Sequence, residues 1–281
     1  MQTYKAVPRY SEEEMTRMEG KFFSSASMRI FTTDVDVFRP DGKILCKFRK
    51  QALNAEETTT LLHIKTAAKL GRTRPSASGI PPEGKYKYIV SKSSGKKLHV
   101  LTTQARSGIV GFYDTTSNFG HHHAHETKQE CRLTAYTSKF LERYKTCLPV
   151  FSKVSKLFRS LVPTRYRAQQ RAIREINPEF VIPGTVFTTV TVNKNFRTAL
   201  HKDSGDYRQG FGVMTVASVG DYEGGYTLFP QYGFGIDCRS GDFLAMDVHQ
   251  WHSNSEMTGT GTRVSFIFYM REKMQKYCPF E

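Results

Sequence analysis

The stretch GTVFTTVTVN at residues 184–193 begins a series of short segments in which apolar residues alternate with polar or small ones. The later segments are GFGVMTVASV (210–219), GGYTLFPQY (224–232), GFGIDC (233–238), DFLAMDV (242–248) and TRVSFIFYM (262–270). A period of two is typical of β-strands, because successive side chains point to opposite faces. Turn-forming pairs such as Gly220-Asp221 and Gly224-Gly225 separate the segments. The pattern predicts a run of short strands, as in a β-sandwich or jelly roll.

A helical block precedes these strands. Residues 128–175 carry apolar side chains at spacings of three and four, which predicts the longest helical stretch of the chain. Pro149 is expected to kink or split this stretch, and Pro163 to separate it from a further helix over residues 164–176. Helices followed by a run of strands predict an α+β fold in which helices back a sandwich or jelly-roll core.

The N-terminal half is expected to be less regular. Residues 1–25 are polar and are expected to form a flexible arm in front of a single domain over residues 26–281. This domain comprises an N-terminal extension (26–127) and the helices plus jelly-roll core (128–281). The extension is expected to contain two strands over 29–50 joined at Pro40-Asp41-Gly42, a helix over 55–70, a basic loop over 71–97, and strands near 98–103 and 108–114.

The charge of the chain is strongly positive and unevenly placed. Lys and Arg outnumber Asp and Glu by 41 to 26, and the formal net charge is +15. Residues 1–200 hold 34 basic and 16 acidic residues, whereas residues 201–281 hold 7 and 10. This asymmetry favours a polyanionic partner such as nucleic acid over a merely solvated surface. No apolar run approaches the roughly 20 residues that span a bilayer, and the N-terminus lacks the apolar core of a secretory signal.

The five cysteines are scattered, odd in number and without a CxxC pair. Such spacing disfavours both a zinc site and a disulfide framework. All five are therefore expected to be reduced thiols, as in an intracellular protein. They are Cys46, Cys131, Cys147, Cys238 and Cys278.

Three polar residues of the strand-rich region point to a metal site: His201 and Asp203 in TALHKDSGD, and His252 in QWHSNSEM. In a strand, residues i and i+2 share a face, so His201 and Asp203 can point at one ion. Two imidazoles and one carboxylate form the facial triad of non-heme Fe(II) oxygenases, which leaves positions for a co-substrate and O2. His249 is a rival third ligand. The competing interpretation is that the histidines are structural.

Arg263 and Ser265 follow in TRVSFIFYM and share one strand face. A guanidinium and a hydroxyl on one face can hold the far carboxylate of a keto acid through a charge-assisted pair and a hydrogen bond. The competing interpretation of Arg263 is a surface cation. A second metal site is an alternative at a separate histidine cluster, although adjacent histidines in a polar loop are more often solvated. That cluster contains His121, His122, His123 and His125.

The segments GTVFTTVTVNKNFRTALHKDSGDYRQGFGVMTV and GDYEGGYTLFPQYGFGIDCRSGDFLAMDVHQWHSNSEM resemble the oxygenase domain of the TET and J-binding-protein family. The resemblance covers roughly residues 130–272, with weaker similarity in VFRPDGKILCKFRK and GIVGFYD. It implies a double-stranded β-helix, Fe(II) and 2-oxoglutarate as cofactor and co-substrate, and O2. It also implies oxidation of the 5-methyl group of a pyrimidine in DNA. Ascorbate in place of 2-oxoglutarate is an alternative.

The resemblance also implies roles for individual residues. His201, Asp203 and His252 resemble the iron ligands, which favours His252 over His249, and Arg263 resembles the 2-oxoglutarate arginine. Asp206 corresponds to a position that contacts the flipped base, and Tyr269 to the aromatic that stacks on it, although a buried aromatic is also often core. Arg271 stands where TET enzymes have a histidine, so the base stays open between thymine and 5-methylcytosine. Two further residues, Asn193 and Arg197, are expected near the site.

Three functional hypotheses follow. The leading one is a DNA 5-methylpyrimidine dioxygenase, with DNA as partner, no membrane association and a monomeric state. The second is a 2-oxoglutarate-dependent hydroxylase of protein side chains, and the third is a non-catalytic DNA-binding module. The expected location is intracellular, in the nucleus of a eukaryote or otherwise in the cytoplasm, and a viral or phage origin fits both.

Overall fold

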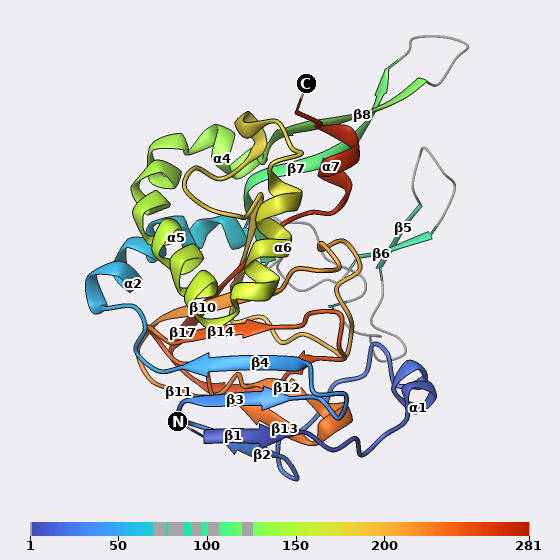
Figure 1. The fold of residues 1–281 in the computed structure, drawn as a ribbon, viewed down its shortest axis with the longest axis vertical. Coiled ribbons are helices and arrows are strands. Elements are labelled where there is room, and N and C mark those ends of the chain that lie inside the picture. Colours follow the sequence, from blue (N-terminus) through green and yellow to red (C-terminus); the bar gives the residue numbers. More distant parts are fainter. Residues whose placement is uncertain are drawn as a thin grey trace.

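The computed structural model describes residues 2–69, 77, 87–90, 97–100, 107–119 and 126–280. Nine strands of this part form one sheet in the order β1-β3-β4-β14-β10-β17-β9-β7-β8 (Figure 1). β1 runs parallel to β3, and the other neighbours in the sheet are antiparallel. The strands are β1 (Gln2–Lys5), β3 (Val35–Phe38), β4 (Ile44–Arg49), β7 (Ser107–Phe119), β8 (Glu126–Leu133), β9 (Thr189–Lys194), β10 (Gly212–Val219), β14 (Phe243–Met246) and β17 (Thr262–Tyr269).

A smaller sheet packs against one end of the large sheet. Its order is β15 (Ser253–Asn254), β12 (Thr227–Phe229), β13 (Phe234–Ile236) and β2 (Arg29–Phe31). Phe48 and Leu244 of the large sheet share a buried apolar cluster with Phe229 and Phe234 of the small sheet. Two sheets around one core, backed by helices, confirm the predicted α+β jelly-roll architecture. Two further strand pairs are β11 (Tyr222–Gly224) with β16 (Met257–Gly259), and β5 (Lys87–Val90) with β6 (Lys97–Val100).

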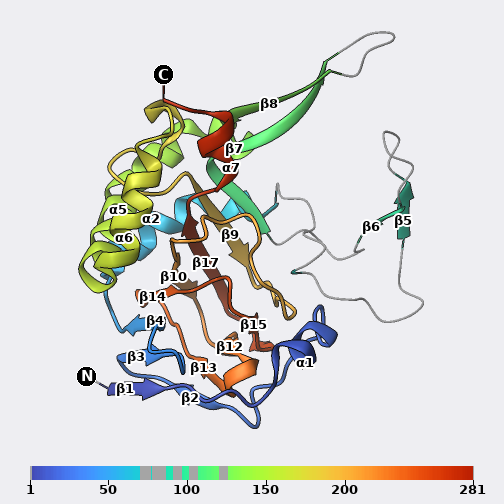
Figure 2. The same ribbon diagram turned by 45° about the vertical axis from the view of Figure 1, so that its right-hand side comes forward.

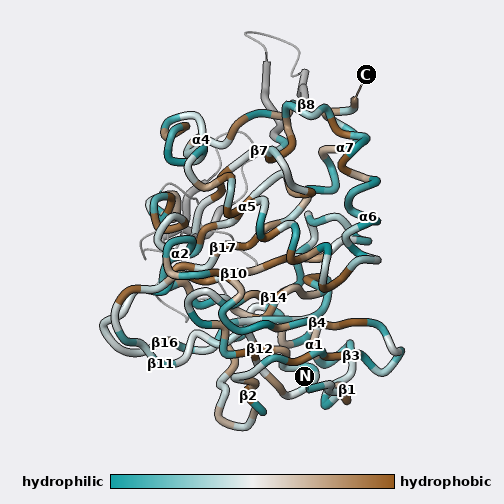
Figure 3. The backbone as a smooth tube through the Cα atoms, turned by 60° about the vertical axis from the view of Figure 1, so that its left-hand side comes forward, coloured by the Kyte–Doolittle hydropathy of each residue, from teal (hydrophilic) through white to brown (hydrophobic). Residues whose placement is uncertain are grey.

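Helices cover the other face of the large sheet. α2 (Ala55–Leu61), α5 (Leu141–Leu161) and α6 (Pro163–Ile173) lie on one side of β10, β17 and β9 (Figure 2). The Phe151 ring of α5 lies edge-on to Phe268 of β17, with ring centroids 5.1 Å apart. Figure 3 shows hydrophobic stretches along β10 and β17 beside α5. The shorter helices are α1 (Glu12–Arg17), α4 (Ala135–Lys139), α7 (Lys273–Tyr277), η1 (Leu62–Lys69), η2 (Pro178–Phe180) and η3 (Pro230–Tyr232). None of the helices described has the length and apolar character needed to cross a membrane.

The helical block begins later than its spacing predicts. Residues 128–133 belong to β8, so the helical prediction is wrong there, because pairing with β7 over Phe112–Phe119 outweighs the local spacing. α5 continues through Pro149, since seven buried side chains hold it on the sheet. Pro163 begins α6 as predicted, at a position where its missing N–H costs little.

The N-terminal residues are more ordered than expected. β1 joins the large sheet, and α1 begins at a capping box in which Ser11 and Glu14 exchange side-chain and backbone bonds. Ala6 and Met15 are buried. The expectation of a flexible arm is therefore wrong for these residues, because a few apolar side chains among many polar ones are enough to dock the segment.

The rest of the N-terminal extension matches its prediction in part. Residues 29–50 form three strands rather than two, and the turn at residues 40–42 joins β3 to β4. The helix expected over residues 55–70 is α2 followed by η1. Most of the loop expected over 71–97 lies outside the described residues, and its described part includes β5. The histidines at positions 121–123 and 125 also lie outside them.

One expectation about the cysteines is wrong. Cys131 of β8 and Cys278, which follows α7, form a disulfide with Cα atoms 5.9 Å apart. They are 147 positions apart in the chain, and α7 brings them together by packing beside β8. Spacing in the sequence carries no sign of such a pair. The other three cysteines are buried free thiols: Cys46, Cys147 and Cys238.

Candidate metal centre and pocket

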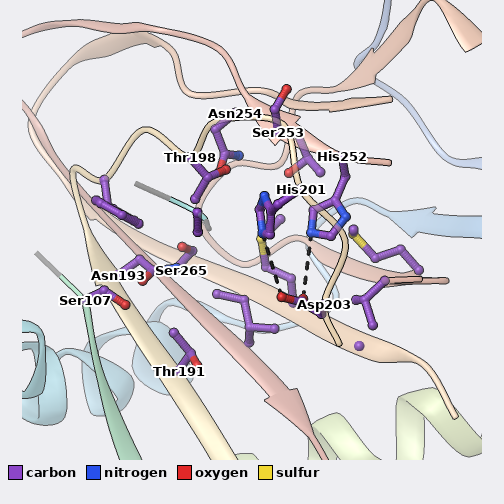
Figure 4. Close-up of a pocket in the computed structure, with 18 of the residues that line it drawn as sticks. Ser107, Thr191, Asn193, Thr198, His201, Asp203, His252, Ser253, Asn254 and Ser265 are labelled. Atoms are coloured by element: carbon purple, nitrogen blue, oxygen red, sulfur yellow. Dashed lines mark hydrogen bonds and ion pairs between the residues drawn. The ribbon is translucent and has the colours of Figure 1, made fainter. Parts of the chain in front are cut away.

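The histidines and the aspartate of the predicted triad converge on one point. His201 and His252 face each other across an antiparallel bridge, with His201 N donating to His252 O at 3.0 Å and His252 N to His201 O at 3.1 Å. Asp203 is held by a bond from its N–H to Val248 O. Each imidazole Nε2 lies 3.7 Å from an Asp203 carboxylate oxygen (Figure 4). One ligand atom from each residue lies within 4.8 Å of the others, so the three can hold one metal ion.

Backbone carbonyls orient both imidazoles. His201 Nδ1 lies 2.7 Å from Ala199 O, and His252 Nδ1 lies 2.9 Å from Gln250 O. A proton on each Nδ1 leaves the Nε2 lone pair directed at the shared point, as a metal requires. Burial and the neighbouring His201 lower the pKa of His252 to about 4, so this ring is neutral at physiological pH.

His249, the rival ligand, lies outside this cluster. Its Nε2 lies 3.2 Å from the backbone oxygen of Asp206, and its Nδ1 lies 3.4 Å from an Asp247 carboxylate oxygen. The Asp247 carboxylate raises the pKa of His249, against the effect of burial. His249 therefore links Asp247 to the Asp206 backbone and contributes no atom to the metal cluster.

A pocket extends from the metal cluster over β9 and β17. Of the residues predicted for the site, it brings Asn193, Asp206, Ser265 and Tyr269 together with the triad. The remaining lining residues are Ala77, Ser107, Thr191, Phe196, Thr198, Gly212, Met214, Thr227, Met246, Val248, Ser253, Asn254 and Ile267. Figure 4 labels ten of the pocket's residues, Asp203 among them.

Arg263 is buried beside this pocket. Its side chain lies on the same face of β17 as Ser265, and the residue is 6% exposed. Within the described residues its Nε and Nη2 have no hydrogen-bond partner. A buried guanidinium with unsatisfied donors is costly, and a carboxylate is the group that satisfies two of them together. The surface-cation interpretation is therefore wrong.

A row of polar residues crosses the sheet next to Ser265. Asn193 of β9 pairs with Ser265 on one side and with Ser107 of β7 on the other. Asn193 Oδ1 and Ser107 Oγ are buried without a partner in the described part of the chain, and so are Thr227 Oγ1 and Ser253 Oγ. Sequence reasoning missed the hydroxyls of Ser107, Thr227 and Ser253, because buried serines and threonines carry no distinctive motif. Polar atoms left unsatisfied around one pocket indicate that it accommodates a polar ligand.

Asp206 and Tyr269, the two residues expected to meet a base, both line the pocket. Asp206 is 8% exposed, and its backbone forms a bridge with Arg271. Tyr269 is 4% exposed, and its hydroxyl accepts a bond from Thr191 Oγ1 at 3.3 Å. Tyr269 is thus both a buried aromatic and a pocket wall, so the two interpretations of this residue coexist.

Two arginines expected at the site are engaged elsewhere. The Arg271 Nε forms an ion pair with the buried carboxylate of Asp114 in β7. Arg197 Nη2 donates to the backbone oxygen of Phe23 at 3.2 Å, and its guanidinium lies 4.8 Å from the ring centre of Phe22. Neither arginine lines the pocket.

Comparisons with known proteins agree with this geometry. A family model described as the oxygenase domain of the 2OGFeDO superfamily (Tet_JBP) matches residues 108–272, more than half of the chain. Thymine dioxygenase JBP1 from Trypanosoma brucei brucei is 32% identical over 171 residues, which are 59% of this chain and 19% of that protein. Bifunctional helicase and thymine dioxygenase JBP2 from Trypanosoma cruzi (strain CL Brener) is 33% identical over 196 residues, or 68% of this chain and 17% of that protein.

The solved structure of NgTET1 in complex with 5mC DNA has the same fold. The TM-score is 0.60 at 14% identity, and the match covers 92% of this chain and 82% of that chain. The chain spans less than a fifth of the length of the two curated relatives. The family match, the fold and the His–Asp–His cluster agree, and the chain belongs to the TET and J-binding-protein family of 2-oxoglutarate- and Fe(II)-dependent oxygenases.

Proposed function

We propose that this chain is a dioxygenase that uses Fe(II), 2-oxoglutarate and O2 to hydroxylate the 5-methyl group of a pyrimidine in DNA. The observation that carries the proposal is the convergence of His201, Asp203 and His252 at a pocket that Asp206 and Tyr269 also line. Family membership supports the oxygenase chemistry. The names of the two sequence relatives, both thymine dioxygenases, support the substrate class.

His201, Asp203 and His252 are the residues that would hold Fe(II). Two imidazoles and one carboxylate are a ligand set that suits Fe(II) and would leave coordination positions open towards the pocket. When bound, the iron supplies the redox chemistry that couples 2-oxoglutarate and O2 to methyl hydroxylation. The Ala199 and Gln250 carbonyls keep both ligand rings in the required tautomer.

Arg263 and Ser265 would hold the far carboxylate of 2-oxoglutarate. The unsatisfied guanidinium donors match a carboxylate in both charge and shape, and the Ser265 hydroxyl on the same strand face adds a third donor. A charged anchor of this kind supports 2-oxoglutarate rather than ascorbate as the co-substrate, because a dicarboxylate leaves one carboxylate for the arginine.

Asp206 and Tyr269 would receive the target base. Tyr269 offers an aromatic wall for a base that has left the duplex. An ionised Asp206 can accept a hydrogen bond from N3–H of thymine or from N4–H of 5-methylcytosine. The relatives' names make thymine the first base to test, and 5-methylcytosine is the second.

DNA is the proposed partner, bound through its phosphates by the basic part of the chain. Residues 1–200 carry 34 Lys and Arg against 16 Asp and Glu. Such an excess gives salt-dependent binding that does not depend on base sequence.

We further propose a monomeric protein inside the cell, which size-exclusion chromatography and localisation of a tagged chain would test.

Nucleoside mass spectrometry tests the proposal. The protein is incubated with Fe(II), 2-oxoglutarate and either unmethylated or 5-methylcytosine-containing DNA, and a parallel arm replaces 2-oxoglutarate with ascorbate. The expected product is 5-hydroxymethyluracil or 5-hydroxymethylcytosine, formed with wild type and absent with Asp203→Ala. The proposed function is wrong if the wild-type protein, shown to be folded and loaded with metal, yields no oxidised pyrimidine on either DNA.

A further inference from the structure

Residues 11–23 contact both chain segments that carry the histidine ligands. We call this segment, which contains α1 and the turn after it, the N-terminal strap. It lies outside residues 108–272, the part matched by the family model. Its contacts fall on the immediate sequence neighbours of the ligands, Leu200 and Lys202 around His201 and Trp251 before His252.

Backbone bonds join the strap to the first ligand segment. Gly20 N donates to Leu200 O at 2.9 Å, and Leu200 N donates to Lys21 O at 2.8 Å. Both partners of this reciprocal pair are main chain, so the strap fixes the path of residue 200 directly. His201, the next residue, then meets His252 through the two backbone bonds of its bridge.

An apolar contact joins the strap to both ligand segments at once. Met15 and Leu200 are fully buried and Trp251 is 5% exposed, and the three form one cluster. Truncating a buried methionine leaves a cavity that its neighbours fill only partly. Here those neighbours are the residues that precede His201 and His252.

A polar contact also joins the strap to both ligand segments. Trp251 Nε1 donates to Glu12 Oε1 at 3.0 Å, and Lys202 Nζ forms an ion pair with the same oxygen. The Lys202 ammonium also lies 4.5 Å from the centre of the Trp251 ring. Glu12 therefore bridges the residue after His201 and the residue before His252.

We propose that the N-terminal strap positions the metal site, with Glu12 and Met15 as its positioning residues. The inference rests on the proposed Fe(II) site and adds that a segment outside the matched oxygenase region determines how tightly that site binds metal. Groups that hydrogen-bond to metal ligands fix the geometry of those ligands, and loss of such a group typically weakens metal binding by roughly 10- to 100-fold. The strap acts one residue further away, through Leu200, Lys202 and Trp251, so we expect the lower end of that range.

The fluorescence of Trp251 can report on the strap, because Trp251 is the single tryptophan of the chain and precedes His252. Acrylamide quenching of its fluorescence reports whether the strap is docked. Co(II), a stand-in for Fe(II) that is stable in air, gives the metal dissociation constant by calorimetry. We expect Met15→Ala and Glu12→Ala to expose Trp251 to acrylamide and to weaken Co(II) binding by roughly tenfold.

Matched variants separate positioning from general stability. Glu13→Ala removes an exposed carboxylate from the same helix and should leave Co(II) affinity unchanged. Val35→Ala in β3 removes buried volume away from the strap and should lower the melting temperature without changing Co(II) affinity. Glu12→Gln keeps an oxygen that can accept from the Trp251 indole, and should recover part of the affinity lost in Glu12→Ala.

The inference is overturned if Glu12→Ala and Met15→Ala expose Trp251 yet bind Co(II) within twofold of wild type. It is also overturned if Val35→Ala weakens Co(II) binding as much as they do, since the effect would then be general stability. Should Met15→Ala fail to fold, Glu12→Ala decides alone, because that side chain is largely exposed. Failure of wild type itself to bind Co(II) would instead refute the metal site.

Discussion

The two faces of β17 carry different kinds of side chain. One face carries Val264, Phe266 and Phe268, which lie in the apolar cluster beneath the helices. The other carries Arg263, Ser265 and Tyr269, which lie in or beside the pocket. All six are buried, so burial alone does not distinguish packing from function. The difference lies in the polar side-chain atoms. Val264, Phe266 and Phe268 carry none, whereas the pocket face holds guanidinium donors without a hydrogen-bond partner among the described residues.

Removing a side chain from the helix face should have the largest effect on stability. We expect Phe268→Ala to lower the free energy of unfolding by about 3–5 kcal/mol, because it leaves a cavity between β17 and Phe151 of α5. Urea unfolding followed by circular dichroism measures the change. Phe268→Leu is the control and should lose less. An unfolding free energy equal to wild type in Phe268→Ala would contradict the assignment of this face to the core.

The next largest effect is expected on the pocket face, and on activity rather than stability. Arg263→Ala should lower kcat/KM for 2-oxoglutarate by roughly 100-fold, about 2.7 kcal/mol, through loss of a charge-assisted carboxylate pair. Its unfolding free energy should be unchanged or higher, because a buried group with unsatisfied donors is removed. Arg263→Lys keeps the charge without the planar fork and should recover little. Loss of stability without loss of co-substrate affinity would show that Arg263 is a packing residue.

Acid should affect the pocket side through His252. Its folded pKa of about 4 lies below the ordinary value of 6.5, so the unfolded chain takes up the proton first as the pH falls. The stabilising contribution of neutral His252 is therefore present above about pH 6.5 and is lost as the pH falls towards 4, by at most about 1.4 kcal/mol per pH unit. Urea unfolding of metal-free wild type and His252→Gln across this range measures it. Parallel pH profiles for the two proteins would rule out this origin.

The smallest effect is expected where α7, just beyond β17, is tied to the sheet edge. Cys131→Ser removes the disulfide to Cys278 and should lower stability by about 2 kcal/mol, the lower end of the usual range. A melting temperature a few degrees lower, and no further change on adding dithiothreitol, is the expected result. Cys46→Ser, at a buried free thiol, is the control and should retain its response to reductant. If reductant leaves wild type unchanged, the disulfide makes no contribution.

Local sequence patterns predicted much of the site. The HxD pair, the later histidine and the R-x-S strand carry their own signature, because residue type and strand periodicity together specify which side chains share a face. Ser107 and Ser253 could not be found in this way, since their importance comes from lying at one pocket, Ser107 on the large sheet and Ser253 on the small sheet. Arg271 was assigned to the base by position, yet its guanidinium pairs with Asp114 of β7, a residue 157 positions earlier.

The amino-acid sequence by itself determined the strand-rich region, the helical block and the chemical identity of the metal ligands, because these depend on short-range periodicity and residue type. Tertiary structure alone decided two further points. It paired Cys131 with Cys278, and it placed Glu12 and Met15 against the neighbours of His201 and His252. Each of these contacts joins residues that are far apart in the chain. The packing of the sheets and helices brings such partners within contact distance, and no local pattern records it.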